Sequence, residues 1–173
     1  MLSLPMVFAS SRLHWLVYGL LACLLMMPQA AQAAAPAVAL YYGRTIPLEE
    51  FRTFDIVVVE PDHGHDPVRY QASGSTLYAY VSVAEAHPSR AYYANIPPSW
   101  KMARNGQWNS DVLDQTPEAW PDFFATRVVG PLWERGYKGF FLDTLDSYRL
   151  AEKFDETAQQ EGLVRVIETL HRR

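Results

Sequence analysis

The segment Asp55-Ile56-Val57-Val58-Val59-Glu60 has four consecutive β-branched apolar residues, with no alternation of apolar and polar positions. A strand of this kind is typical of a parallel sheet, because helices cover both of its faces. Similar short apolar runs occupy residues 38–43, 76–83 and 138–143. Longer stretches of mixed polarity separate these runs. This alternation predicts an α/β fold with a parallel sheet of at least four strands.

Helical patterns lie between the predicted strands. Residues 47–54 predict a short helix, and a longer helix is expected with Thr116 as its N-cap, a bend at Pro131 and an end at Gly136. A last helix is marked by apolar residues at helical spacing: Leu163, Val166, Ile167 and Leu170. Residues 87–115 are rich in Pro, Asn, Gly and Trp and predict a long loop, which is uncommon without a function.

Acidic residues follow three of the four predicted strands. They are Glu60 and Asp62, then Glu85, then Asp143 and Asp146. In parallel sheets the chemistry gathers at the carboxyl ends of the strands, and several carboxylates there suit glycoside hydrolysis, which needs a proton donor and a nucleophile or base. The alternative is that these groups cap helices or pair with arginines. The candidate arginines are Arg90, Arg104, Arg127 and Arg149.

Asp143 is the strongest catalytic candidate. It follows Phe140-Phe141-Leu142, where a solvated surface charge would be out of place. A carboxylate partly withdrawn from water at such a position is suited to act as an acid or a nucleophile. Asp146, three residues later, is expected to begin the next helix and to support Asp143 by its field or a hydrogen bond.

Aromatic residues near the strand ends and in the long loop could stack on sugar rings. The candidates for substrate contact are Tyr42, Tyr80, Trp108 and Tyr148. The alternative is that such rings only pack the mouth of the sheet.

The segment Asp62-His63-Gly64-His65-Asp66 has the composition of a zinc site, but its spacing matches no established ligand motif. We therefore expect a solvated loop, or contact with substrate by one histidine, and predict no metal. There is no Gly-rich phosphate loop and no Gly-x-Ser-x-Gly motif in the sequence, so we expect no nucleotide cofactor and no serine hydrolase chemistry. The basic residues are scattered, which argues against nucleic acid as a partner.

Residues 1–33 predict a cleavable secretory signal. Arg12 precedes an apolar run from Leu16 to Met27, and the segment ends in Ala31-Gln32-Ala33, which suits signal peptidase. The run is shorter than the roughly 20 residues that span a bilayer, so no stable membrane anchor is expected. The only cysteine, Cys23, lies in this run, and an apolar segment follows it where a lipoprotein would have a polar tether. We predict export to the periplasm or the medium.

The remaining residues, 34–173, are predicted to form one domain of 140 residues without a disulfide. Loss of Arg12 with the signal changes the net charge from −4 to −5. A protein with this negative net charge tolerates or attracts a cationic substrate.

Five blocks of the sequence are similar to a known enzyme group. They are residues 41–43, 58–62, 78–85, 105–108 and the most specific one, 139–148, which reads Gly-Phe-Phe-Leu-Asp-Thr-Leu-Asp-Ser-Tyr. In these blocks the chain resembles the endo-α-1,4-polygalactosaminidases of glycoside hydrolase family 114 and the related hydrolase domain of the Pel exopolysaccharide system.

The resemblance implies a (β/α)8 TIM barrel that cleaves α-1,4-linked galactosamine or N-acetylgalactosamine exopolysaccharide. Asp143 matches the family's catalytic aspartate, and Glu60, Asp62 and Glu85 match acidic positions that bind substrate or support the site. The family's second catalytic carboxylate follows the fifth strand, beyond Arg173. A complete barrel needs about 250 residues, so we expect only about the first four β/α units here, and a chain that is inactive by itself.

Two other functions stay open at this stage. The chain could be a polysaccharide-binding module that has kept the acidic and aromatic rim without catalysis, or an unrelated extracytoplasmic α/β protein. Since a barrel divided in this way exposes the edges of its sheet, self-association through those edges is also expected.

Overall fold

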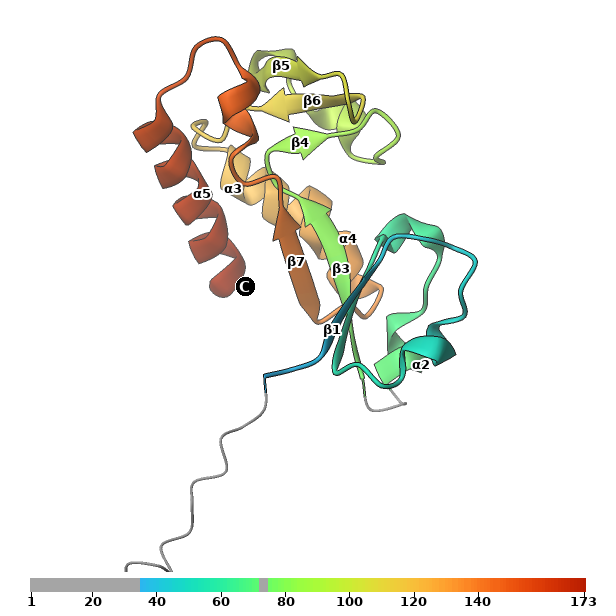
Figure 1. Cartoon of the computed structure of the whole chain (residues 1–173). Helices are drawn as coiled ribbons and strands as arrows, with labels where there is room; N and C mark the ends of the chain where they lie inside the picture. The colour runs from blue at the N-terminus through green and yellow to red at the C-terminus, as the bar shows by residue number, and fades with distance from the viewer. Residues whose placement is uncertain (1–34, 72–74) are drawn as a thin grey trace, which may run out of the picture. The chain divides into compact units, whose positions relative to one another are not determined.

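Four parallel strands form the main sheet of the protein, in the order β1-β2-β3-β7 (Figure 1). They are β1 (Val38–Tyr41), β2 (Ile56–Val59), β3 (Thr76–Ser82) and β7 (Gly139–Asp143). The structure is a computed structural model that describes residues 35–71 and 75–173, so the predicted signal at residues 1–33 lies outside the described residues. The predicted parallel α/β sheet is confirmed, and each of the four predicted strands is present.

The two faces of the sheet differ in chemistry. On β3, Leu77, Ala79 and Val81 are buried and belong to the hydrophobic core, which also includes residues of the helices. The residues between them, Tyr78 and Tyr80, are half-buried on the opposite face. The register pairs Tyr80 with Phe141 and Ser82 with Asp143, and paired residues of parallel strands point to the same side of the sheet. Asp143 therefore shares a face with the β3 tyrosines.

The helices differ from the predictions at their ends. The expected helix at residues 47–54 is a 3-10 turn, Leu48–Phe51, and a short helix α2 (Pro67–Gln71) precedes β3. The long helix begins as α3 (Trp120–Phe123), so Thr116 is not its N-cap; the Thr116 N–H instead bonds to Asp114 Oδ1.

That helix continues through a π-helical segment, Phe124–Val129, into α4 (Gly130–Glu134). Pro131 cannot donate a helical hydrogen bond, and the widened segment comes directly before it. The predicted bend at Pro131 therefore takes the form of a π-helical segment. Gly136, with φ of 103°, follows the end of α4.

The last helix is α5 (Glu156–His171). Its N-cap is Asp155, whose carboxylate accepts a hydrogen bond from the Ala158 N–H at 3.1 Å. Gly162 allows close approach of α5 to the segment that precedes α3, because a Cβ there would lie 2.1 Å from the Gln115 carbonyl oxygen. Within residues 35–71 and 75–173, no helix is both long enough and apolar enough to cross a membrane.

A second sheet occupies the segment that was predicted to be a long loop. Its antiparallel strands are β4 (Glu85–Ala86), β5 (Lys101–Asn105) and β6 (Ser110–Leu113), in the order β4-β6-β5. The prediction of an irregular loop was wrong, because β6 buries polar residues and lacks the apolar pattern of a strand. Figure 1 shows this sheet beyond the carboxyl ends of β3 and β7.

Candidate active site

Asp143 lies at the carboxyl end of β7 beside two tyrosines. Tyr80 and Asp143 lie on the same face of the sheet, close enough for the Asp143 carboxylate to raise the pKa of the Tyr80 phenol. The Tyr42 ring meets the Tyr80 ring edge-on, with centroids 5.0 Å apart. Burial raises the pKa of both tyrosines; the Asp143 carboxylate raises both further, and Glu60 adds to the effect at Tyr42. Both phenols are therefore neutral at physiological pH, and each can donate its hydroxyl proton.

Glu60 and Asp62, which follow β2, share one arginine. Arg90 donates to both carboxylate oxygens of Glu60, at 2.5 and 2.8 Å, and to Asp62 Oδ2 at 2.8 Å. The hydrogen bonds with Glu60 are the main cause of a raised pKa at Arg90. Both carboxylates therefore pair with an arginine, which was the alternative to a catalytic role in the sequence analysis. The Asp62 side chain is still 53% exposed, whereas that of Glu60 is only 16% exposed.

Glu85 is a buried carboxylate with neutral partners. Its residue is 5% exposed, and it accepts hydrogen bonds from Ser147 Oγ at 2.6 Å, from Asn105 Nδ2 at 3.1 Å and from Ser110 Oγ. These donors come from β5, β6 and the 3-10 turn Ser147–Leu150. This burial argues against direct contact between Glu85 and a polymer. The side chain instead joins the second sheet to the loop after β7.

The other three predicted contact residues have different surroundings. Trp108 is 67% exposed in the turn between β5 and β6. Asp146 is exposed and precedes the turn Ser147–Leu150, but its side chain makes no capping hydrogen bond. Tyr148 is only 3% exposed, packs against Phe154 with ring centroids 5.3 Å apart, and so is not available to stack on a sugar.

Sequence reasoning missed Thr144 and Ser82. Thr144 follows Asp143 directly and has φ of 62°, which is rare for a β-branched residue and costs roughly 1–3 kcal/mol. Its Oγ1 lies 2.8 Å from Ser82 Oγ and accepts a hydrogen bond from the Ala84 N–H at 3.2 Å. No residue type alone signals a positive φ at a threonine, so this feature could not be read from one sequence.

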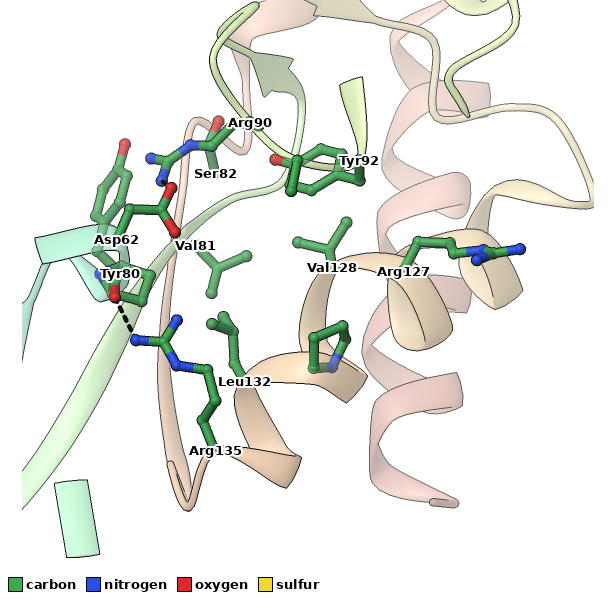
Figure 2. A pocket seen from close by; sticks show the side chains of 13 residues that line it. Asp62, Tyr80, Val81, Ser82, Arg90, Tyr92, Arg127, Val128, Leu132 and Arg135 are labelled. Atoms are coloured by element: carbon green, nitrogen blue, oxygen red, sulfur yellow. Dashed lines mark hydrogen bonds and ion pairs between the residues drawn. The ribbon is translucent and has the colours of Figure 1, made fainter. Parts of the chain in front are cut away.

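A cavity of about 150 Å³ lies next to this site (Figure 2). Val81, Val128 and Leu132 form its apolar wall, and Asp62, Tyr80 and Arg90 lie along another side. Arg135 closes it from below by donating to the Pro61 carbonyl oxygen at 2.6 Å. Asp143 is not among the residues that line this cavity, but Tyr80 and Ser82, which share its face of the sheet, are.

The two histidines of the predicted loop do not converge on a metal site. His63 Nδ1 lies 3.1 Å from the Gly43 carbonyl oxygen, and burial lowers the pKa of His65. Across the described ranges, 35–71 and 75–173, no three His, Cys, Asp or Glu side chains are grouped so that they could hold a metal ion.

Carboxylates and aromatic rings at the carboxyl ends of parallel strands are the arrangement of a TIM-barrel glycosidase. The family comparison agrees: the model of glycoside-hydrolase family GH114 matches residues 26–173. The chain belongs to this family. Among curated protein sequences, no relative matches it.

Solved structures support the same assignment. The glycoside hydrolase domain of PelA from Pseudomonas aeruginosa is 35% identical and superposes with a TM-score of 0.68, over 80% of this chain and 56% of that domain. The structure of Aspergillus fumigatus Ega3 with galactosamine is 12% identical, with a TM-score of 0.63 over 79% of this chain and 55% of that one. An α-galactosidase from Thermus thermophilus is 16% identical, with a TM-score of 0.56 over 78% and 36%.

The last two likenesses show the fold alone. The chain spans little more than half the length of the PelA and Ega3 domains, so its parallel sheet corresponds to part of a TIM barrel. The predicted barrel type, with about the first four β/α units present, is confirmed.

Proposed function

We propose that this chain provides the Asp143 side of a glycoside hydrolase that cleaves α-1,4-linked galactosamine or N-acetylgalactosamine exopolysaccharide. The observation that carries the proposal is the Asp143 carboxylate at the end of β7, on the face of the sheet that bears Tyr80 and the neighbouring ring of Tyr42. The PelA domain is 35% identical, and the Ega3 structure contains galactosamine, which supports the substrate class.

Asp143 acts in this proposal as one of the two carboxyl groups that glycoside hydrolysis needs, roughly 5–10 Å apart on opposite sides of the bond. The neutral phenol of Tyr80 lies beside the carboxylate and, as a donor, would orient it toward the sugar. Tyr42, which is 44% exposed, offers a ring against which the sugar could stack. Asp62 Oδ2 accepts a hydrogen bond from Arg90 at 2.8 Å. The carboxylate is exposed and can still accept a hydrogen bond from a substrate amine or hydroxyl.

The other carboxylates near the site are poorly suited to act as the second catalytic group. Arg90 holds Glu60 and binds Asp62, and Glu85 is buried among neutral donors. A carboxylate in a bidentate ion pair is a weak base, and a buried one cannot reach a glycosidic bond. We therefore propose that the second group comes from outside the described residues, and that the chain by itself does not turn over substrate.

A chimera tests this proposal. The chain is fused to the part of the PelA domain that it does not span, and cleavage of a galactosamine polymer is measured with and without Asp143→Asn. The folded chimera should cleave, and Asp143→Asn, which is nearly isosteric, should lower kcat/KM roughly a thousandfold or more.

Asp146→Asn is the matched control, since it removes an exposed carboxylate three residues away, and it should leave turnover within about tenfold of the parent. Glu85→Gln should reduce turnover less than Asp143→Asn. A folded chimera without turnover, or one whose activity survives Asp143→Asn, would show that the chain does not have this function.

A non-catalytic polysaccharide-binding role is the second candidate. It is favoured by Trp108, which is 67% exposed at the end of a hairpin and could stack on a sugar ring. Saturable binding of a galactosamine polymer that Trp108→Ala abolishes, with no cleavage by the chimera, would support this role.

Residues 1–33 are proposed to act as a cleavable signal, and the polysaccharide is then met in the periplasm or the medium. The support is the sequence of the segment itself, with Ala31 and Ala33 before the cleavage point. Mass spectrometry of exported protein should find Ala34 at the N-terminus.

A further inference from the structure

Thr144, the residue after Asp143, has a backbone conformation that threonine rarely adopts. Its φ is 62°, and among the described residues the other non-glycine residue with positive φ is Asn109. Asn109 lies in the turn between β5 and β6, where asparagine tolerates this conformation. A β-branched residue does not tolerate it well, so the surrounding contacts must hold Thr144 in place.

The hydroxyl of Thr144 makes those contacts. Thr144 Oγ1 lies 2.8 Å from Ser82 Oγ, the side chain that ends β3, and accepts from the Ala84 N–H at 3.2 Å. It also lies 2.7 Å from the Asp143 carbonyl oxygen. Ser82 Oγ is in turn 2.7 Å from the Glu85 carbonyl oxygen. A single side chain thus links the end of β7 to the segment that leaves β3.

The backbone of Asp143 is fixed by the same link. The Val83 N–H donates to the Asp143 carbonyl oxygen at 2.9 Å, which extends the pairing of β3 and β7 by one bond. Tyr80, two residues before Ser82 on β3, lies on the same face of the sheet as the Asp143 carboxylate, which raises the pKa of its phenol. β3 therefore fixes the backbone of Asp143 and carries the tyrosine next to its carboxylate, and any slip between the two strand ends would move the carboxylate relative to Tyr80.

We propose that Thr144 is a positioning residue for Asp143, whose hydroxyl holds the ends of β3 and β7 in the register that places the carboxylate against Tyr80. The importance of this role for catalysis rests on the proposed function of Asp143. The positioning role itself does not rest on that function, because the position of the carboxylate can be measured without turnover.

The experiment follows the carboxyl ¹³C resonance of Asp143 in the full chain, assigned by its loss in Asp143→Asn. Thr144→Val keeps the shape of the side chain and removes the hydroxyl, Thr144→Ser keeps the hydroxyl, and Tyr80→Phe removes the phenol hydroxyl beside the carboxylate. The Asp143 resonance should move in Thr144→Val in the same direction as in Tyr80→Phe, and Thr144→Ser should leave it at the parent position. The Ala84 amide should exchange roughly tenfold faster in Thr144→Val, as expected for the loss of one hydrogen bond.

Two outcomes overturn the inference. One is faster exchange at Ala84 with an unmoved Asp143 resonance, which would make Thr144 a structural residue only; the other is a Thr144→Ser resonance displaced as far as that of Thr144→Val. If Thr144→Val does not fold, Ser82→Ala decides, because it removes the partner hydroxyl and leaves Thr144 intact; it should also move the resonance. If Asp143→Asn retains full activity in the chimera while these resonances behave as expected, the proposed function fails and the positioning role stands.

Discussion

The two sheets of this protein are stabilised by different kinds of interaction. The parallel sheet is held by apolar burial: Val57 and Leu77 are 0% exposed and Val81 is 3% exposed. In the antiparallel sheet, all four residues of β6 are buried, and two of them, Ser110 and Asp111, are polar. One sheet therefore depends on packing, and the other on the satisfaction of buried polar groups.

Two carboxylates organise the antiparallel sheet. Asp111 bonds the Tyr93 hydroxyl and pairs with Lys101 at 3.0 Å and Arg104 at 2.8 Å. Glu85 instead has only neutral hydroxyl and amide partners. Polar networks of this kind are specific in geometry and costly to break in part. This difference suggests a rigid apolar sheet that bears Asp143, next to a polar sheet that responds to pH and to single polar substitutions.

The largest effect is expected from the apolar sheet. Leu77→Ala should lower the free energy of unfolding by about 3 kcal/mol or more, because it leaves a cavity in the fully buried middle of β3. Urea unfolding measures the loss. Val38→Ala, at a position that is 49% exposed on β1, is the control and should cost less than about 1 kcal/mol. Equal losses for the two variants would contradict an apolar core centred on β3.

A smaller and more local effect is expected at Glu85. Glu85→Ala leaves the donors of Ser110 and Ser147 without their acceptor and should cost about 2 kcal/mol. Hydrogen exchange should accelerate in β5 and β6 and stay slow in β2 and β3. Glu118→Ala, on an exposed surface carboxylate, serves as the control. Uniform acceleration over the whole chain would show that the two sheets are a single cooperative unit.

The parallel sheet could be predicted from the sequence because its strands are short apolar runs. Val57, Val58 and Val59 belong to an unbroken run of β-branched apolar residues, and their burial follows from that run alone. The antiparallel sheet gives no such signal. Ser110 and Asp111 would be assigned to a surface loop by their polarity, and only the three-dimensional meeting with Glu85, Tyr93 and Arg104 explains their burial.

The site was predictable in part for the same reason. The positions of Tyr42, Glu60, Tyr80 and Asp143 follow from the rule that parallel strands end at one edge. The pairing of Arg90 with Glu60 could be named only as one of several arginine alternatives, since 30 residues separate the two in sequence. The burial of Tyr148 depends on its packing against Phe154, and the strained φ of Thr144 depends on contacts with Ser82 and Ala84.

The stability of the antiparallel sheet should depend on pH through Asp111. Burial alone would raise the pKa of Asp111, but hydrogen bonds from Tyr93, Arg104 and Lys101 outweigh it and lower the pKa to about 2. An unfolded aspartate has a pKa of about 3.9, so this contribution to stability is complete above that value and is lost as the pH falls toward about 2. Between these values the parent should lose stability more steeply than Asp111→Asn, as measured by urea unfolding at several pH values. Parallel curves for the two proteins would show that the Asp111 cluster does not stabilise the fold.

The smallest effect is expected at the edges of the parallel sheet. In the described part of the chain, β1 and β7 each have a single neighbour in this sheet, and Leu40 and Phe141 are 57% and 36% exposed. Unpaired strands with exposed apolar side chains promote association, and an edge lysine opposes it. Leu40→Lys should therefore weaken self-association, measured by sedimentation over a range of concentrations, and change the free energy of unfolding by less than about 0.5 kcal/mol. Val164 on α5 is 53% exposed, so Val164→Lys removes a similar apolar side chain away from the strand edge and should leave association unchanged. If Val164→Lys weakens association as much as Leu40→Lys does, general apolar exposure rather than strand pairing brings the copies together.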